Sequence, residues 1–378
     1  MSFNDLPDIC LWKIFENVHE AKDLIRLSKV CSRWSDLITL RFNRVKYLQM
    51  MDVNSNKVDY IDANSLWMNE YTNWNDYNLF KLFPNLKIID TVAFDYHASF
   101  NLPEIVKNNP QIKGLIGMDK LRKDGYLENI EMCAAEFNFD YKKVFRPDQL
   151  KQVCCFRFHT NDLPSFIEYF PNLKRLNIEP REESIVSDGV FYHGPNLSSL
   201  KILELGTNNF FEQFTGFHLM GFCPSLESAF FHCWTQYIYV DESIKNYNLR
   251  DLVIENTGLF SWSLLQRVLS KFPNLHHLGI RGIRKIKYSN LEELVKLLPE
   301  LKILDLRKCK NVNHKSADFL SKYCIKENRS IVIYHNCENE PIEWPKLVNT
   351  REQIVYGFDF MKHCFYKTFN SLPVLMDE

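Results

Sequence analysis

The chain has 378 residues, a formal net charge of -1, and an apolar content of 46% with 14% aromatic residues. This composition is ample for a folded core. The near-neutral balance argues against a nucleic-acid or anionic-membrane partner. No charged-then-apolar leader and no run of ~18 apolar residues is present, so we expect neither secretion nor membrane spanning. Eleven cysteines without a C-x-x-C pair indicate a reducing compartment, which predicts a cytoplasmic and/or nuclear protein.

The first 40 residues predict helices with wide apolar stripes. Asn4 or Asp5 can cap a helix that has Pro7 in its first turn. A segment of about 40 residues rarely forms a stable core alone, so we expect it to complete itself against a partner or the next domain. The first stripe is Leu11, Ile14, Phe15 and Val18, and a second helical pattern carries Leu24, Leu27, Val30, Cys31, Trp34, Leu37 and Ile38.

The same segment, LPDICLWKIFENVHEAKDLIRLSKVCSRW, resembles an F-box. The matching features are Leu6-Pro7, Ile14-Phe15, Asp23-Leu24 and the closing Val30-Cys31-x-Arg33-Trp34, whereas Ile9 and Cys10 depart from the usual pattern. The resemblance implies binding to the Skp-type adaptor of SCF ubiquitin ligases, and through it to cullin and RING subunits. The alternative is a small helical packing module without a partner. The candidate adaptor-binding residues are Leu6, Pro7, Leu11, Ile14, Phe15, Leu24, Leu27, Val30, Cys31 and Trp34.

From residue 45 onwards, a helical stripe that ends in proline and leads into a strand recurs. Most steps between copies are close to 26 residues, and the longest is 41 residues, from Leu115 to Phe156. We expect an inserted or irregular repeat in that long step. The central strand residues are Ile89, Leu115, Phe156, Leu176, Leu203, Ala229, Leu252, Leu278, Leu304 and Ile331.

The copy from Leu298 to Cys324 has an L-x-x-L-x-L strand, then Cys309, a polar turn, a short helix and Cys324. It resembles the cysteine-containing leucine-rich repeat, which is stable only when stacked on other copies. The resemblance implies an α/β protein in which a helical F-box precedes a right-handed horseshoe solenoid, with a parallel concave sheet and outer helices. The predicted domains are residues 1–44, the F-box; 45–337, the repeat array with an irregular insert at about 118–148; and 338–378, a C-terminal cap or tail.

The last 40 residues break the repeat period. We expect them to cap the open end of the array, because a terminal repeat leaves an apolar face uncovered. The alternative is a tail that folds towards the concave face and shapes a binding site. The residues predicted to cover the open end are Trp344, Ile354, Phe358, Phe365 and Phe369.

Strand alternation sends the repeat leucines inwards and the intervening residues to the concave surface. These residues mix acidic, basic and aromatic side chains, which suits a protein or peptide substrate. The alternative is a merely solvated face. The candidate substrate-binding residues are Arg157, His159, Arg175, Glu179, Glu204, Phe230, His232, Trp234, Glu255, Arg281, Arg307 and Tyr334, and the basic end consists of Arg281, Arg284, Lys285, Lys287, Arg307, Lys308 and Lys310.

No spacing predicts chemistry within the chain. His218, Cys223, His232 and Cys233 fit no common zinc pattern, and phosphate-loop, H-E-x-x-H and G-x-S-x-G motifs are absent. We therefore expect a non-catalytic receptor without metal or cofactor, which holds a protein substrate for an SCF-type ubiquitin ligase. The alternative is a leucine-rich scaffold or inhibitor without a ubiquitin-ligase role, and RNA binding through the basic end is disfavoured by the charge balance.

Overall fold

The computed structural model describes residues 3–51, 64–69, 79–93, 102–117, 126–180, 191–207, 213–233, 235, 237–256, 260–335 and 375–376. The chain forms two compact units, Met1–Leu150 with Thr368–Glu378, and Lys151–Lys367. Trp234 and the five residues predicted to cap the array lie outside the described residues. Within the described ranges, no helix is long and apolar enough to cross a membrane.

The first unit begins with short helices, as the apolar stripes predict. The second predicted stripe is split into two helices, because the backbone of Cys31 is extended, with φ -159° and ψ 166°. Cys31 thus starts a new helix instead of continuing the previous one. The elements are η1 (Phe3–Asp5), α1 (Asp8–Glu16), α2 (Ala21–Leu27) and α3 (Ser32–Asn43).

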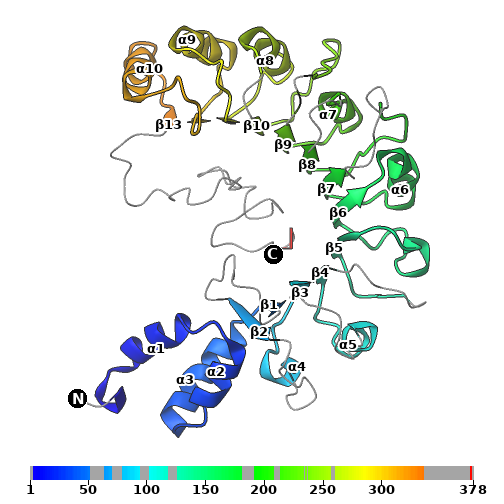
Figure 1. Ribbon diagram of the computed structural model, residues 1–378, viewed down its shortest axis with the longest axis vertical. Helices are drawn as coiled ribbons and strands as arrows, with labels where there is room; N and C mark the ends of the chain where they lie inside the picture. The colour runs from blue at the N-terminus through cyan, green and yellow to red at the C-terminus, as the bar shows by residue number, and fades with distance from the viewer. Residues whose placement is uncertain are drawn as a thin grey trace. The chain divides into compact units, whose positions relative to one another are not determined.

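Parallel strands follow in the first unit, in the order β2-β1-β3-β4-β5 (Figure 1). Leu115 on β4 pairs with Cys133 on β5. The predicted irregular insert therefore contains a strand of its own, which the sequence pattern missed because MCAAE lacks the leucine spacing. The elements are β1 (Tyr47–Met51), β2 (Ser65–Asn69), α4 (Leu79–Leu82), β3 (Ile88–Ala93), α5 (Leu102–Asn108), β4 (Gly114–Ile116), β5 (Met132–Glu136) and η3 (Tyr141–Lys143).

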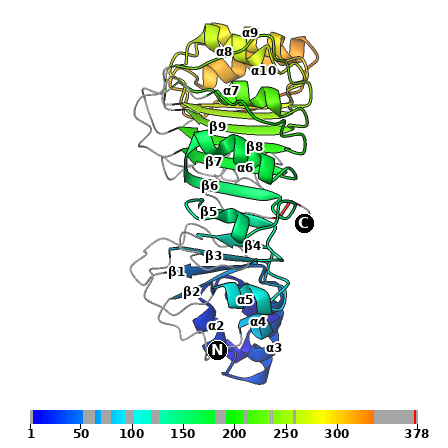
Figure 2. The same ribbon diagram turned by 90° about the vertical axis from the view of Figure 1, so that its right-hand side faces the viewer.

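The second unit is a run of parallel strands in chain order, β6 to β13, with its helices on one side of the sheet (Figures 1 and 2). The strands are β6 (Gln152–Phe158), β7 (Arg175–Pro180), β8 (Ile202–Thr207), β9 (Ser228–Cys233), β10 (Asp251–Asn256), β11 (His277–Arg281), β12 (Ile303–Asp305) and β13 (Val332–Tyr334). The helices are η4 (Thr160–Asp162), α6 (Leu163–Tyr169), α7 (Gly216–Leu219), η5 (Met220–Phe222), α8 (Trp262–Leu269), α9 (Tyr288–Leu297) and α10 (His314–Lys326).

The strand register confirms most of the predicted central residues. One row of Cα partners joins Leu176, Leu203, Ala229, Leu252, Leu278 and Leu304. Two central residues were wrong: Val153 pairs with Leu176 where Phe156 was expected, and Ile333 pairs with Leu304 where Ile331 was expected. The register of β6 shifts between Cys155 and Phe158, where Arg157 has a φ of 48°. The horseshoe shape stays a prediction.

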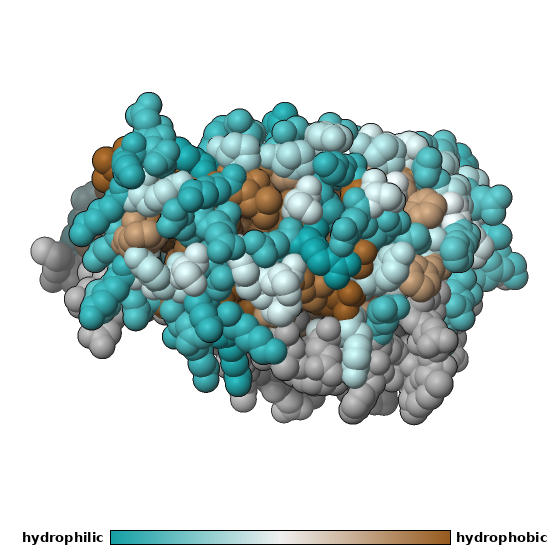
Figure 3. Space-filling model, turned by 90° about the horizontal axis from the view of Figure 1, so that it is seen from above, coloured by the Kyte–Doolittle hydropathy of each residue, from teal (hydrophilic) through white to brown (hydrophobic). Residues whose placement is uncertain are grey.

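The core of the second unit lies between the sheet and its helices. The row residues Leu176, Leu203 and Leu252 are completely buried. Phe231 of β9 packs edge-on against Phe214 and Phe217, with ring centroids 5.2 Å and 5.1 Å apart. The face that carries α8, α9 and α10 is mainly hydrophilic, with separate hydrophobic residues (Figure 3). The helices thus bury one side and expose a polar one.

Candidate functional site

The N-terminal helices separate the candidate adaptor-binding residues into core and surface. Leu11, Phe15 and Leu24 are buried inside the helical segment. The Trp34 ring packs edge-on against Phe15, with centroids 5.3 Å apart. These four side chains build the segment's own core, so their role is to shape the surface.

A second set of apolar side chains is exposed. We call Pro7, Ile9, Cys10, Ile14 and Val30 the exposed apolar set. Ile9, Ile14 and Val30 are 67%, 39% and 58% exposed. Four of the five lie at the start of α1 or along it, and such exposure on a short segment is typical of a docking surface. The remaining candidates, Leu6, Leu27 and Cys31, are half-buried, as is the Trp34 side chain of the core.

Ile9 was not among the sequence candidates. It stands out in the sequence only as a departure from the usual F-box pattern, which has an acidic residue at this position. In the structure it is the most exposed large apolar residue of α1. Its apolar side chain at a position that the pattern reserves for a carboxylate was the signal that could have identified it.

Arg33 of α3 holds the start of α1 in place. Its Nε and Nη2 donate to Asp8 Oδ1 at 2.7 Å and 2.6 Å, and Nη2 also donates to the carbonyl of Leu6 at 2.6 Å. Arg33 belongs to the F-box signature, so the structure supplies a physical reason for its presence: it fixes the chain entry into the helix that carries most of the exposed apolar set.

The opposite side of the segment is attached to the first strands. Arg41 Nη2 donates to the carbonyl of Ser65 at 2.9 Å, and the Trp67 amide donates to the carbonyl of His19 at 2.9 Å. Phe42 and Phe83 stack edge-on at 5.3 Å. The helices are therefore part of the first unit's fold and complete their core against the strands. Of the two possibilities that the sequence left open, a partner or the next domain, this is the second.

In the second unit, the residues between the buried leucines line up across the strands. One row runs through Cys154, Asn177, Glu204, Phe230, Val253, Gly279, Asp305 and Tyr334. A parallel row joins His232, Glu255 and Arg281. Asn177, Glu204, Phe230, His232, Glu255, Arg281 and Tyr334 thus come together as alternation predicts.

The register excludes two candidates from these rows. Arg157 lies within the register shift of β6 and His159 follows it, and both are exposed. Cys154 therefore occupies the row position that Arg157 was expected to take. A bulge of this kind leaves no signal in an apolar–polar pattern.

Most of the candidate substrate-binding residues are more buried than expected. Arg175, Glu204, Phe230, Arg281 and Arg307 are buried, although an exposed concave surface was predicted for them. Glu255 and Tyr334 are also buried. Neighbouring strands lie about 4.8 Å apart, so long side chains in one row pack against both neighbours. Buried charges in such rows need ion partners, and several have them.

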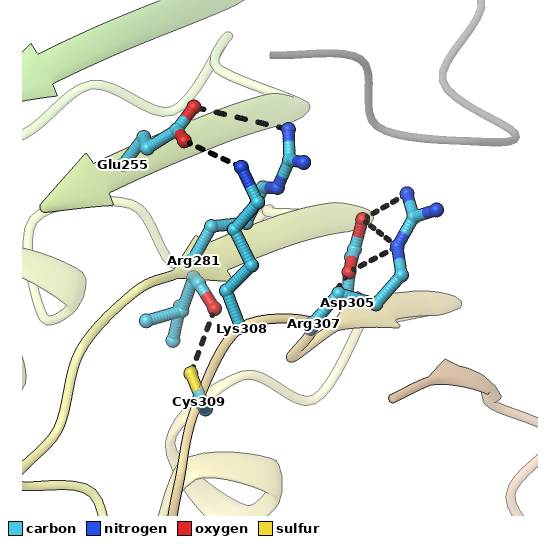
Figure 4. A network of polar contacts seen from close by, with 7 residues as sticks. Glu255, Arg281, Asp305, Arg307, Lys308 and Cys309 are labelled. Carbon is cyan, nitrogen blue, oxygen red and sulfur yellow. Dashed lines mark hydrogen bonds and ion pairs between the residues drawn. The ribbon is translucent and has the colours of Figure 1, made fainter. Parts of the chain in front are cut away.

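Figure 4 shows one such network, at β10, β11 and β12. Glu255 accepts from Lys308 Nζ at 3.4 Å and lies 3.8 Å from Arg281 Nη1. Asp305 accepts from Arg307 Nε at 3.0 Å and from Nη2 at 2.7 Å, and the guanidinium lies over the Tyr334 ring at 5.7 Å. Ion pairs thus engage the buried carboxylates of β10 and β12.

Two further titratable candidates, Glu179 and His232, have perturbed pKa values. The pKa of Glu179 is raised, because the carboxylate is desolvated and Glu204 lies nearby with the same charge. The pKa of His232 is lowered, first by burial and then by Lys308 and Arg281, against an opposing effect of Glu255. Glu179 and Glu204 thus place two carboxylates close together on β7 and β8, whereas His232 on β9 lies near the cations Lys308 and Arg281.

A third polar group lies at the beginning of the strands. Ser228 Oγ donates to Asp251 Oδ2 at 2.6 Å, and His277 Nδ1 lies 2.5 Å from Asp251 Oδ1. The carboxylate stands between the hydroxyl and the imidazole, so the imidazole cannot accept the serine proton. This arrangement connects three strands but does not activate a nucleophile.

The residues weighed as zinc ligands are two buried thiols, Cys223 and Cys233, and two half-buried imidazoles, His218 and His232. Cys223 Sγ donates to the carbonyl of Leu219 at 3.4 Å, and burial raises its pKa to about 12. Cys233 is buried on β9, and burial also raises its pKa. In the part of the chain that the structure describes, no group of three His, Cys, Asp or Glu residues could hold a metal ion.

Comparison with known proteins assigns the N-terminal segment. Residues 3–42 match the F-box-like family model, which covers the helices η1, α1, α2 and α3 almost to the last residue. No curated protein matches the chain. The helices that carry the exposed apolar set therefore form an F-box-like domain.

Proposed function

We propose that this chain is the substrate-recognition subunit of an SCF-type ubiquitin ligase. In this proposal the F-box-like domain docks a Skp-type adaptor, and through it cullin and RING subunits. The following strands and helices form a leucine-rich-repeat array that holds a protein substrate. The chain acts by position: it raises the effective concentration of substrate lysines near the charged conjugating enzyme and performs no bond chemistry itself.

One observation carries the proposal. The F-box-like match lies on helices that are tied to β2 by hydrogen bonds of Arg41 and His19, while Ile9, Ile14 and Val30 remain exposed. An adaptor can therefore cover the exposed apolar set without displacing the contacts that hold the domain to its unit. Apolar anchors of this kind account for most of the affinity of protein interfaces.

The free thiols support the proposed site of action. None of the nine cysteines in the described part of the chain is in a disulfide. Free thiols suit the reducing cytoplasm or nucleus, where we place the protein.

The test is co-purification of a Skp-type adaptor with the full chain. We expect the triple variant Ile9→Asp/Ile14→Asp/Val30→Asp to lose the adaptor, because each change places a charge in the apolar contact. Leu40→Asp is the matched control, since Leu40 is 55% exposed on α3 and lies outside the exposed apolar set. Retention of the adaptor by the triple variant, or failure of the wild-type chain to retain it, would contradict the proposal and favour a scaffold without a ligase role.

A further inference from the structure

We infer that the loops after β11 and β12 form a docking surface for an acidic peptide segment. We call Arg284, Lys285, Lys287 and Lys310 the basic loop surface. All four residues are exposed. The inference deepens the proposed function, because it names the chemical class of substrate, and it locates that substrate on loops at the ends of the strands instead of on the buried rows.

The charged residues of these loops are all basic. Segments 282–291 and 306–317 contain no Asp or Glu, in a chain whose net charge is -1. Among the described residues, none of the four cations of the basic loop surface pairs with a carboxylate. Surface cations are usually interspersed with anions, so an uncompensated group attracts an anionic partner and steers its approach.

The two loops are held side by side. Asn311 Nδ2 donates to the carbonyl of Arg284 at 2.5 Å, and Cys309 Sγ donates to the carbonyl of Ile280 at 3.1 Å (Figure 4). The turns themselves use left-handed backbone at Gly282, with φ 74°, and at Lys308, with φ 64°. A surface fixed in this way binds without a large cost of ordering its own loops.

The basic residues of this region fall into two groups, those paired with buried carboxylates of the sheet and those exposed on the loops. Arg281 faces Glu255, and Arg307 faces Asp305, so these carboxylates are occupied within the sheet. Lys308, which follows β12, also reaches Glu255. The sequence grouped all seven basic residues together. The structure buries two of them, Arg281 and Arg307, in ion pairs, and leaves the basic loop surface exposed.

The acidic residues that flank these loops favour a peptide over a nucleic acid as the partner. Asp241 and Glu242 lie beyond β9, and Glu292 and Glu293 lie within α9, so acidic residues are found on both sides of the basic loops in the sequence. Nucleic-acid binding usually needs a basic stripe that follows many phosphates. Tyr288, which is 45% exposed beside Lys287, offers an apolar contact for a peptide side chain.

The test measures the anisotropy of fluorescein-labelled peptides with the full chain. The probes are a peptide of alternating Glu and Ser, the same peptide with phosphoserine at its Ser positions, and a neutral version with Gln in place of Glu. We expect the acidic peptides to bind and the neutral one not to. We expect Arg284→Ser/Lys285→Ser/Lys310→Ser to weaken binding about tenfold, as three exposed charge contacts suggest. Tighter binding of the phosphoserine version would identify phosphate as the preferred anion.

The matched control removes the same charge elsewhere. Lys245, Lys322 and Lys326 are exposed and lie outside the basic loops, so Lys245→Ser/Lys322→Ser/Lys326→Ser should bind the acidic peptide like the wild type. Equal losses in both triple variants, no acidic-peptide binding at all, or tighter binding of a single-stranded RNA would overturn the inference. Adaptor co-purification is measured separately. A failure of peptide binding would therefore contradict only the basic loop surface as a docking site, and a failure of adaptor binding would contradict only the F-box proposal.

Discussion

Arg41, at the end of α3, donates through Nη2 to the main-chain carbonyl of Ser65 on β2 at 2.9 Å, and its side chain is completely buried. This contact joins the F-box-like helices to the first strands of the same unit. Arg41 is charged, and a pattern of apolar residues assigns such a residue to the surface. A buried guanidinium is retained only where hydrogen bonds offset its desolvation.

Replacing Arg41 should therefore destabilise the first unit. We expect Arg41→Met, which keeps an apolar stem of similar length, to lower the free energy of unfolding by about 2–4 kcal/mol, because the Ser65 carbonyl loses its charged donor. Chemical denaturation of the full chain measures the change. The control is Arg44→Met on the exposed ion pair with Glu16, for which we expect at most about 0.5 kcal/mol. Equal effects of the two substitutions would contradict this role of Arg41.

Replacing Glu179 by a neutral residue should stabilise the protein at neutral pH. Burial and Glu204 raise its pKa, so the folded state binds the proton more tightly than the unfolded state. The stabilisation is present below the usual carboxyl pKa and is lost as the pH rises through the raised pKa. Glu179→Gln should thus be more stable than wild type at pH ~7, by up to about 1 kcal/mol, with a smaller difference at pH ~4.

Thermal melts at several pH values test this prediction. Glu168→Gln, on the exposed side of α6, is the control and should change stability by less than about 0.5 kcal/mol. If Glu179→Gln were less stable than the wild type at neutral pH, the Glu179 carboxylate would have to be favourably engaged there, and the argument from like charges would be wrong.

His232 should make stability fall in weakly acidic solution. Its pKa is lowered mainly by burial, so the unfolded state takes up a proton before the folded state does. The contribution of neutral His232 to the free energy of unfolding is fully present above the ordinary histidine pKa of about 6.5 and is lost as the pH falls below it. His232→Gln should show a smaller drop in melting temperature between pH ~7.5 and pH ~5.5 than wild type. His314→Gln, at an exposed position, should keep the wild-type slope.

Asp305 and Arg307 should be strongly coupled, because both are buried in a bidentate pair. Arg307→Met alone should cost about 3–5 kcal/mol, since it leaves a buried carboxylate without this partner. Adding Asp305→Leu should recover most of that loss. About 1 kcal/mol should remain, because Asp305 Oδ1 also accepts from the Arg307 amide at 3.0 Å.

A double-mutant cycle by chemical denaturation measures this coupling. The exposed pair Arg146 and Glu128, 2.7 Å apart, provides the comparison and should couple by less than about 1 kcal/mol. If the losses in the free energy of unfolding caused by the Asp305 and Arg307 substitutions were additive, the two side chains would act independently, and the predicted coupling would be wrong.

The leucine spacing determines the repeat structure locally, because each strand buries one side and each proline ends a helix before the next strand. Six central residues, from Leu176 to Leu304, align as their spacing predicts. The same pattern could not find β5, whose MCAAE buries small residues without leucines, nor the bulge at Arg157, which changes the register without changing the pattern.

By itself, then, the sequence determined that helices with F-box features precede a series of parallel strands, and which side of most strands faces the core. The tertiary structure alone decided which F-box residues form the core and which stay exposed, that Arg41 binds Ser65, and that Arg281 and Arg307 are buried while Arg284 and Lys310 are not. The reason is that periodicity reports one side chain's direction relative to its own backbone, whereas burial and ion pairing depend on the neighbouring strand and its register.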